Sequence, residues 1–368
     1  MAYTERKGIL DKIERLRGRP LIAYVTNLRQ NLNVQMNPDV IPQITKQLLS
    51  IPKETKDLDF LIVSHGGDPL VSWRIVSLLR EQFTKVSALI PYCAYSAATL
   101  LVLGADEILM HPFSNLGPVD PQLSRRRRLP HKEGQESEYE TIRFSTGDIR
   151  HYLEFVKQDV GLTDQEPLQK SFEQLANEIG TIPIGVAKRA SNFALMMGER
   201  ILSLHMKDES KTKIIVEALN KSFFHHGYPL HRSEVSQMGL PVKHPPEDLQ
   251  NLMWELWLDY ENEMECNSPF DPLFIVLKDP NAAPLLSPVP QVQIPANLPP
   301  NLMQQATKQI LQQIGITTIP PVDYSVLASS LESTRCHSQA RIEGKIFATR
   351  RPDMTIATSI IRYPQKWV

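Results

Sequence analysis

One serine of this sequence stands where a nucleophile could act. Residues 92–99 read YCAYSAAT, and Ser96 falls between a strand-like run and a small apolar helix that Gly104 ends. Free N–H groups at a helix start, together with the helix macrodipole, can stabilise an oxyanion. Serine is also among the commonest helix N-caps, so the local sequence leaves an ordinary capping role open. Cys93 is a rival nucleophile, but it precedes the helix start and fits a buried structural cysteine.

A glycine pair is the second candidate feature. Gly66 and Gly67 follow the apolar run 60–63 in the string SHGGD. Glycines let backbone N–H groups approach a ligand closely, so the pair could hold a substrate oxygen. Many connections between a strand and a helix also contain two glycines, and an ordinary turn therefore remains open.

The segments around these features alternate between strand and helix patterns. Apolar runs at 20–25, 60–63, 86–90 and 107–110 indicate strands, and the run at 60–63 is typical of a buried parallel strand. Asp68 and Pro69 are typical of the N-cap and first turn of a helix, and Ser96 opens the next one. This rhythm predicts a layered α/β fold.

The two features in this order resemble known serine peptidases. The Clp protease proteolytic subunit and signal peptide peptidase A have a strand, a Gly-Gly turn, a helix and a strand, then a serine that opens a buried helix. The sequence is most similar to the serine dehydrogenase proteinase family, a relative of both. The strings that carry the similarity are SHGGDP, YSAATLLVLGADEI, LGPVDPQL and HGYPLHRSEVSQMGLPV, within residues 18–245. The resemblance implies an α/β fold of the Clp/crotonase type, built from repeated strand-strand-helix units.

The resemblance also implies a Ser–Asp–His triad. In this sequence Ser96 would be the nucleophile, Asp120 the acid and His226 the base. The N–H groups of Gly67 and Ala97 would hold the oxyanion. The chain order differs from the Ser–His–Asp order of the Clp subunit, which is chemically acceptable because triads are defined by geometry.

Two adjacent histidines compete for the role of base. His226 is favoured over His225 because it precedes Tyr-Pro, as in the family's usual His-Asp-Tyr-Pro string. Gly227 occupies the position of the Asp in that string. Only one of the two histidines is expected to face the site, because neighbours in an extended segment point to opposite sides.

The implied activity is that of a serine peptidase that hydrolyses peptide bonds through an acyl-enzyme on Ser96, without a metal or an organic cofactor. Three alternatives stay open. The first is a serine–lysine dyad, as in signal peptide peptidase A. The second is an acyl-CoA enzyme of the crotonase type, which shares the fold and the oxyanion turn. The third is a catalytically weak scaffold that keeps the protease fold. The lysines available for the dyad are Lys132, Lys157, Lys170 and Lys188.

Composition restricts the partners and the compartment. The 368 residues carry a formal net charge of −1, and the basic run at 125–128 is followed by acidic residues, so no nucleic-acid partner is indicated. Three scattered cysteines fit a reducing compartment and predict neither a disulfide framework nor a zinc site. The charged N-terminus lacks the apolar core of a signal peptide, and no apolar run approaches a membrane span of about 18 residues. We therefore expect a cytoplasmic protein that acts on a peptide or protein and, as its relatives do, self-associates.

Changes in composition suggest three regions. Residues 1–264 would form the Clp/crotonase-like domain, with a solvated loop at 124–145 and helices near 148–157, 167–179 and 184–205. Residues 265–300 contain a proline-rich stretch that predicts a linker or an extended wrap. Residues 301–368 would form a small C-terminal unit, with a helix at 302–314 and a β-hairpin at 340–362.

Overall fold

The computed structural model describes residues 3–128, 139–221, 225–286, 299–313, 317–351 and 355–368. It divides into two compact units. The first comprises residues 1–26, 35–260 and 331–337, and the second comprises 27–34, 261–330 and 338–368.

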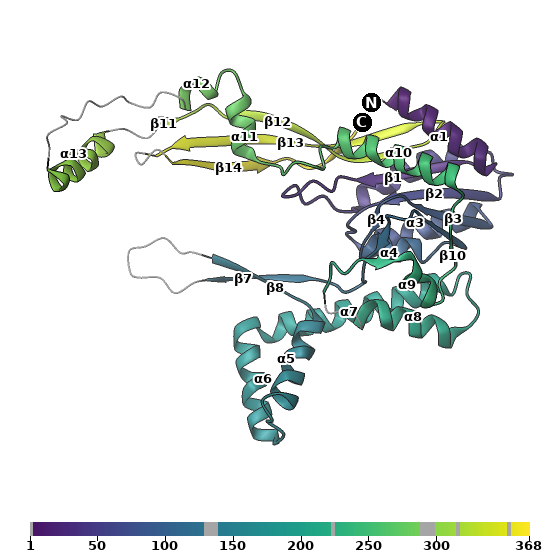
Figure 1. The fold of residues 1–368 in the computed structure, drawn as a ribbon. Coiled ribbons are helices and arrows are strands. Elements are labelled where there is room, and N and C mark those ends of the chain that lie inside the picture. Colours follow the sequence, from purple (N-terminus) through teal and green to yellow (C-terminus); the bar gives the residue numbers. More distant parts are fainter. Residues whose placement is uncertain (1–2, 129–138, 222–224, 287–298, 314–316, 352–354) are drawn as a thin grey trace. The chain divides into compact units, whose positions relative to one another are not determined.

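A parallel sheet forms the centre of the first unit (Figure 1). Its neighbouring strands run in the order β10-β5-β3-β2-β1, and each of these pairs is parallel. The bounds are Leu21–Thr26 for β1, Asp57–Val63 for β2, Lys85–Ile90 for β3, Glu107–Met110 for β5 and Val242–Lys243 for β10. The strands predicted from apolar runs are therefore confirmed, and the fold is α/β as expected.

Helices cover both faces of this sheet. The Arg17 side chain of α1 (Tyr3–Arg17) reaches Asp59 on β2 and Glu107 on β5, at 2.8 and 3.0 Å. On the opposite face, α3 (Pro69–Gln82) and α4 (Ala97–Val102) pack over Phe60 and Ala88. Successive side chains of a strand point to opposite faces of the sheet, so Asp59 of β2 faces α1 and the next residue, Phe60, faces α3 and α4.

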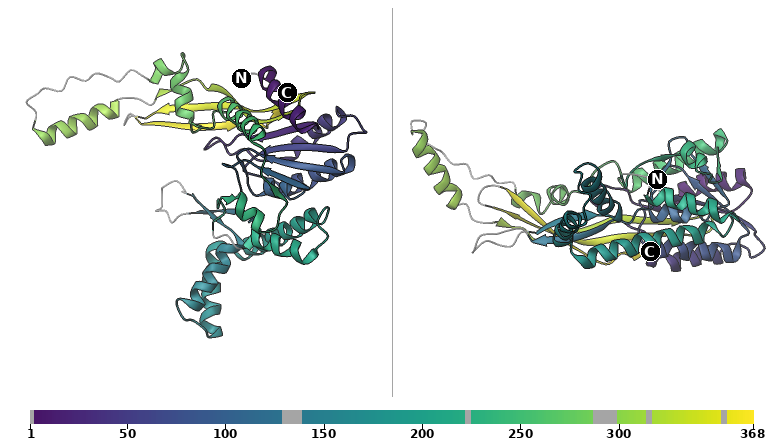
Figure 2. Two further views of the ribbon diagram at one scale, coloured as in Figure 1. Left: turned by 45° about the vertical axis from the view of Figure 1, so that its right-hand side comes forward. Right: turned by 90° about the horizontal axis from the view of Figure 1, so that it is seen from below.

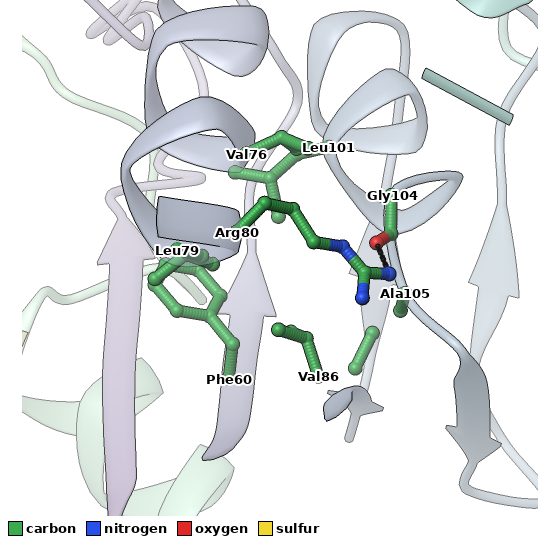
Figure 3. Close-up of a pocket in the computed structure, with 9 residues that line it drawn as sticks. Phe60, Val76, Leu79, Arg80, Val86, Leu101, Gly104 and Ala105 are labelled. Carbon is green, nitrogen blue, oxygen red and sulfur yellow. Dashed lines mark hydrogen bonds between the residues drawn. The ribbon is translucent and has the colours of Figure 1, made fainter. Parts of the chain in front are cut away.

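Arg80 of α3 binds the backbone at the end of α4 and so connects these two helices (Figure 3). Its guanidinium donates to the Gly104 carbonyl at 2.6 Å and to the Asp106 carboxylate at 2.8 Å. A Cβ added at Gly104 would come within 2.7 Å of the Val76 side chain, so α3 and α4 approach closely at this glycine. A small apolar cavity beside Arg80 lies between these two helices and the sheet.

Shorter strands and further helices complete the first unit. Strand β4 (Cys93–Ala94) pairs in parallel with β6 (Asn115–Leu116), which pairs antiparallel with β9 (Leu230–His231). Helices α5 and α6 lie side by side (Figure 2), and the predicted helices in this region are confirmed. The remaining bounds are Pro38–Val40 for the 3-10 turn η1, Ile41–Leu49 for α2, Thr146–Gln158 for α5, Gln165–Ile179 for α6, Thr181–Leu202 for α7, Glu209–Lys221 for α8, Arg232–Gln237 for α9 and Glu247–Glu263 for α10.

The prediction of a loop at 124–145 is wrong for 124–128 and 139–144, and residues 129–138 lie outside the described residues. Strands β7 (Leu123–Arg128) and β8 (Tyr139–Phe144) form an antiparallel hairpin. Two side-chain contacts cross the hairpin. Arg127 forms an ion pair with Glu140 at 2.8 Å, and the Arg126 guanidinium lies 5.0 Å from the Tyr139 ring centre. Such cross-strand pairs stabilise a ladder, which charge counting along the sequence does not reveal.

The second unit contains a long antiparallel sheet. Strands β13 (His337–Arg350) and β14 (Ile356–Arg362) pair antiparallel, which confirms the predicted hairpin. The proline-rich stretch is partly helical, because Asp271 caps α11 (Pro272–Lys278) through two backbone N–H groups and Val276 is buried. The other bounds are Ala283–Leu286 for α12, Pro300–Gln313 for α13, Thr317–Thr318 for β11, Val322–Glu332 for β12 and Lys366–Trp367 for β15.

Candidate active site

Ser96 occupies a strained turn between β4 and α4. Its backbone has φ 53° and ψ −117°, although it is not a glycine. Positive φ is unfavourable for residues with a side chain, and such strain clusters at functional sites. The Ser96 side chain makes no capping hydrogen bond to α4. Ser96 is therefore not an ordinary side-chain N-cap in this structure, and its hydroxyl is not used to cap α4.

The turn that carries Ser96 is held from several sides. Thr99 donates its hydroxyl to the carbonyls of Ala94 and Gly117, at 2.8 Å each. From α3, the Ser72 hydroxyl donates to the Ala97 carbonyl. These contacts come from three different segments, so the backbone on both sides of Ser96 is fixed by its surroundings.

Gly66 and Gly67 form a turn packed directly against the serine. Both have positive φ, 96° and 154°. A Cβ added at Gly66 would lie 2.5 Å from the Tyr95 carbonyl oxygen and 2.9 Å from the Ala97 nitrogen. One added at Gly67 would lie 2.5 Å from the Met36 backbone. Glycine is therefore required at both positions by close backbone approach as well as by conformation.

The hydrogen bonds of this turn set the direction of the Gly67 N–H. The Gly66 carbonyl accepts from the Met36 N–H at 2.8 Å, and the Asp68 N–H donates to the Met36 carbonyl at 3.0 Å. In a trans peptide the C=O and N–H groups point in opposite directions, so the Gly67 N–H points away from Met36. Among the hydrogen bonds of the described residues, neither this N–H nor that of Ala97 donates to a protein acceptor. Both predicted oxyanion donors are thus available.

Asp120 and His226 line one pocket. Val119 is anchored to the end of α8, because its N–H donates to the Leu219 carbonyl at 2.8 Å and its carbonyl accepts from Asn220 at 2.7 Å. His226 follows that helix end and thereby reaches the segment of Asp120. The other residues that line the pocket are Gln122, Ser145, Gly147, Asp148, His151 and His225.

Both histidines line this pocket, which Ser96 does not line, so the expectation that only one of them faces the serine stays a prediction. The segment is a turn rather than an extended strand: the His225 Nδ1 accepts from the Gly227 N–H at 3.0 Å, and the Tyr228 N–H donates to the His225 carbonyl at 3.0 Å. The two side chains differ in environment, however. His225 is exposed, whereas the Nδ1 of the half-buried His226 is enclosed and has no hydrogen-bond partner among the described residues.

Burial controls the electrostatics of the pair. It raises the pKa of Asp120 to about 6, with hydrogen bonds from Ser145 and Gln122 acting in the opposite direction and the charge of Asp148 adding to the rise. Burial also lowers the pKa of His226, against a hydrogen bond to the Asp120 backbone. A neutral imidazole is the form that can accept a proton, so this environment suits a general base near neutral pH.

The three predicted catalytic residues are brought together only in part. Asp120 and His226 meet, but Ser96 does not line their pocket. Within the described part of the chain, no hydrogen bond joins the Ser96 hydroxyl to either side chain, or the His226 ring to the Asp120 carboxylate. The assignment of the triad stays a prediction.

The sequence argument missed His65 and Tyr95, which flank the serine and the glycine turn. Their rings stack with centroids 5.6 Å apart and planes inclined by 15°. Burial raises the pKa of Tyr95 to about 12, so its phenol remains neutral. Gly117 packs on Tyr95, since an added Cβ would lie 2.7 Å from the ring. The position of His65 directly before the glycine pair is the signal that could have revealed it.

The lysines proposed for a dyad lie on the surface. Lys157, Lys170 and Lys188 are exposed on α5, α6 and α7, and Lys132 lies outside the described residues. A lysine base needs a depressed pKa, which burial provides. The exposure of these side chains therefore argues against a serine–lysine dyad formed by any of the three.

Comparison with known proteins bears on the first part of this arrangement. Residues 4–130 match the family model of the ClpP-like SDH-type serine proteinases. The predicted family resemblance and ClpP-like fold are confirmed there. The segment that matches the ClpP-like family contains Gly66, Gly67, Ser96 and Asp120 and ends before His226.

Two uncharacterized proteins of Methanocaldococcus jannaschii are similar to the chain, each 26% identical. One alignment covers 65% of this chain and 71% of the relative, and the other covers 57% of this chain and 62% of the relative, which is less than two thirds of its length. Among solved structures, a mutant of the 1510-N membrane-bound stomatin-specific protease matches with a TM-score of 0.35 and 12% identity. That alignment covers 59% of this chain and 79% of the other.

Two kinds of feature are absent from the described residues. No group of three or more His, Cys, Asp or Glu side chains in that part of the chain could hold a metal ion. None of the described helices combines the length and the apolar character needed to cross a membrane.

Proposed function

We propose that this protein is a serine peptidase that cleaves peptide bonds through an acyl-enzyme on Ser96. The observation that carries the proposal is the strained Ser96 turn with the Gly66 and Gly67 turn packed against it. Both lie in the segment that matches the ClpP-like SDH-type serine proteinases.

The proposed reaction follows from these groups. The Ser96 oxygen attacks the substrate carbonyl carbon while His226 takes its proton, and Asp120 holds the imidazole in place. The N–H groups of Gly67 and Ala97 stabilise the oxyanion, each by about 3 kcal/mol. The amine then leaves with the proton from His226. A water molecule repeats the sequence and releases the acid and the free serine.

For this reaction the Asp120 carboxylate must reach the Nδ1 of His226, and the ring must approach Ser96. Catalytic hydrogen bonds are often long or misaligned in the absence of substrate and tighten in the complex. We propose that substrate binding brings the serine, the imidazole and the carboxylate into line.

A fluorophosphonate probe tests the nucleophile directly. We expect it to label one serine in the wild-type protein, and peptide mapping should locate the adduct at Ser96. Ser96→Ala should remain unlabelled. Ser77→Ala is the matched control, because the Ser77 hydroxyl bonds only the Trp73 carbonyl within its own helix. Labelling elsewhere, or equal labelling of Ser96→Ala, would rule out the assignment.

The scaffold alternative keeps one supporting observation, the absence of a hydrogen bond from Ser96 to His226 among the described residues. A wild-type chain that stays unlabelled in every assembly state would favour it. An acyl-CoA enzyme of the crotonase type needs no serine nucleophile, so it would also stay unlabelled at Ser96 but would convert an acyl-CoA substrate.

Self-association is part of the proposal, because relatives of this fold assemble into rings or trimers. The exposed Ile182 on α7 and Ile214 on α8 are examples of apolar side chains that an interface would cover. Light scattering at micromolar concentration should show more than one copy of the chain. A monomer throughout that range would contradict the expectation.

A further inference from the structure

A buried serine lies directly behind the glycine turn. The Ser64 side chain is fully buried, and its hydroxyl oxygen accepts from the Gly66 N–H at 3.0 Å. Thr26, also fully buried at the end of β1, donates its hydroxyl to the same oxygen at 2.9 Å. Ser64 thus connects the sheet to the turn, and it takes no part in the steps of the proposed reaction.

The Ser64 backbone is joined to the segment that carries the nucleophile. Its N–H donates to the Cys93 carbonyl at 3.1 Å, and its carbonyl accepts from the Tyr95 N–H at 2.9 Å. The same residue therefore holds the nucleophile turn through its backbone and the glycine turn through its side chain. A shift of Ser64 would change the distance between Ser96 and the oxyanion donors.

Two contacts fix the peptide group that presents the Gly67 N–H. The Ser64 hydroxyl holds the Gly66 N–H, and the Met36 N–H holds the Gly66 carbonyl at 2.8 Å. Two successive glycines have several accessible conformations, so this peptide could rotate if one tether were lost. With both tethers present, the Gly67 N–H points away from Met36 and donates to no protein acceptor among the described residues.

We infer that Ser64 is a positioning residue of the oxyanion site, with Thr26 orienting its hydroxyl. Ser64 contacts no substrate and acts through Gly66 on the direction of the Gly67 N–H. Loss of the hydroxyl leaves the buried Gly66 N–H without an acceptor, which favours rotation of the peptide toward another partner. The inference rests on the proposed function, because it assigns a task to the same site.

The experiment measures the rate of phosphonylation of Ser96 at increasing probe concentration in wild type, Ser64→Ala and Ser87→Ala. Saturation separates probe binding (KI) from the maximal rate of bond formation (kinact). Complete removal of one oxyanion donor costs about 10²–10³ in rate, so misalignment of one donor should lower kinact by about 10- to 100-fold. KI should stay within about twofold, because the misaligned donor acts mainly in the transition state.

Ser87→Ala is the matched control. Ser87 is equally buried, and its hydroxyl donates to Glu107 at 2.9 Å near the amino ends of the strands, away from the glycine turn. It should lose thermal stability, as Ser64→Ala does, and keep the wild-type kinact. Equal loss of kinact in both variants would show that Ser64 is only structural, and a wild-type kinact in Ser64→Ala would also overturn the inference.

Thr26→Val covers the case in which Ser64→Ala does not fold, since valine keeps the shape of threonine. It should lower kinact by a smaller factor of about 3 to 10, and an unchanged kinact would overturn the inference. Failure of the proposed function looks different. In that case the wild-type protein is not labelled at Ser96 at all, and the positioning role fails with it.

Discussion

Gly66 lies so close to Ser96 that a Cβ built on the glycine would come within 3.0 Å of the serine Cβ. The two residues belong to different strand–helix connections, which meet at the carboxyl ends of β2 and β3. Open α/β sheets bind ligands at this edge. Because of this contact, the strained serine lies beside the Gly67 and Ala97 N–H groups. A side chain on Gly66 would disrupt this arrangement.

Gly66→Ala should abolish labelling of Ser96 and lower stability. The added methyl would lie 2.5 Å from the Tyr95 carbonyl oxygen, and alanine also disfavours the φ of 96°. Gly8→Ala is the control, because a Cβ added there would meet no side chain and no other segment of the described residues within 4 Å. The control should keep wild-type labelling and raise the unfolding free energy by about 0.5–1 kcal/mol, since alanine favours helix. Full labelling of Gly66→Ala would show that this turn is not part of the site.

Ser96→Gly should be more stable than Ser96→Ala by about 1 kcal/mol, because only the glycine adopts φ 53° without a steric cost. Both variants lack the hydroxyl and should be unreactive with the probe. Urea denaturation of the two proteins measures the difference in unfolding free energy. Equal stabilities would mean that the serine is not strained in solution.

The sequence predicted the elements whose patterns are local. The apolar run of β2, the Asp68 cap and the small residues after Ser96 each indicate their own element. The long strand β12 was missed, because only its first four residues alternate between buried and exposed side chains, and the buried Ser329 and Glu332 interrupt its apolar pattern. The hairpin of β7 and β8 was missed because Arg127 finds Glu140 only across the ladder.

The candidate site was predictable to the same extent. Ser96 and the glycine pair could be found because conformation requires their residue types. The meeting of Asp120 with His226 followed from the family resemblance alone, as it depends on the anchoring of Val119 to the end of α8. Nothing in the local sequence marks Ser64 as a tether, because its role lies in two contacts that only the folded backbone creates.

Asp120→Asn should stabilise the protein at pH 8 and not at pH 4. The pKa of about 6 in the folded state exceeds the usual value of about 3.9, so ionisation opposes folding. The stability linked to the neutral carboxyl is present below about pH 4 and is lost as the pH rises through about 6. Thermal unfolding at both pH values measures this. Asp164→Asn, at an exposed position without a side-chain capping bond, is the matched control for the substitution itself and should change the unfolding temperature only slightly. A variant that is less stable than wild type at pH 8 would contradict the raised pKa.

The pH dependence of labelling should identify the base. If His226 accepts the proton of Ser96, the rate requires a neutral His226 and an ionised Asp120. The pKa of His226 is lowered from about 6.5 and that of Asp120 is about 6, so the rate should rise with pH around 6 and level off by about pH 7. A lysine base would move this rise toward alkaline pH.

Three alanine variants complete the test, and each removes one histidine near the site. His226→Ala should lose labelling by a factor of about 10² or more, the usual contribution of a general base. His225→Ala should keep most of it, because the His225 Nδ1 is engaged by the Gly227 N–H. His65→Ala removes the ring that stacks on Tyr95 and should retain the acid limb of the profile. If His226→Ala keeps its rate while His65→Ala loses both rate and acid limb, the base is His65, and the Asp120–His226 pair serves another purpose.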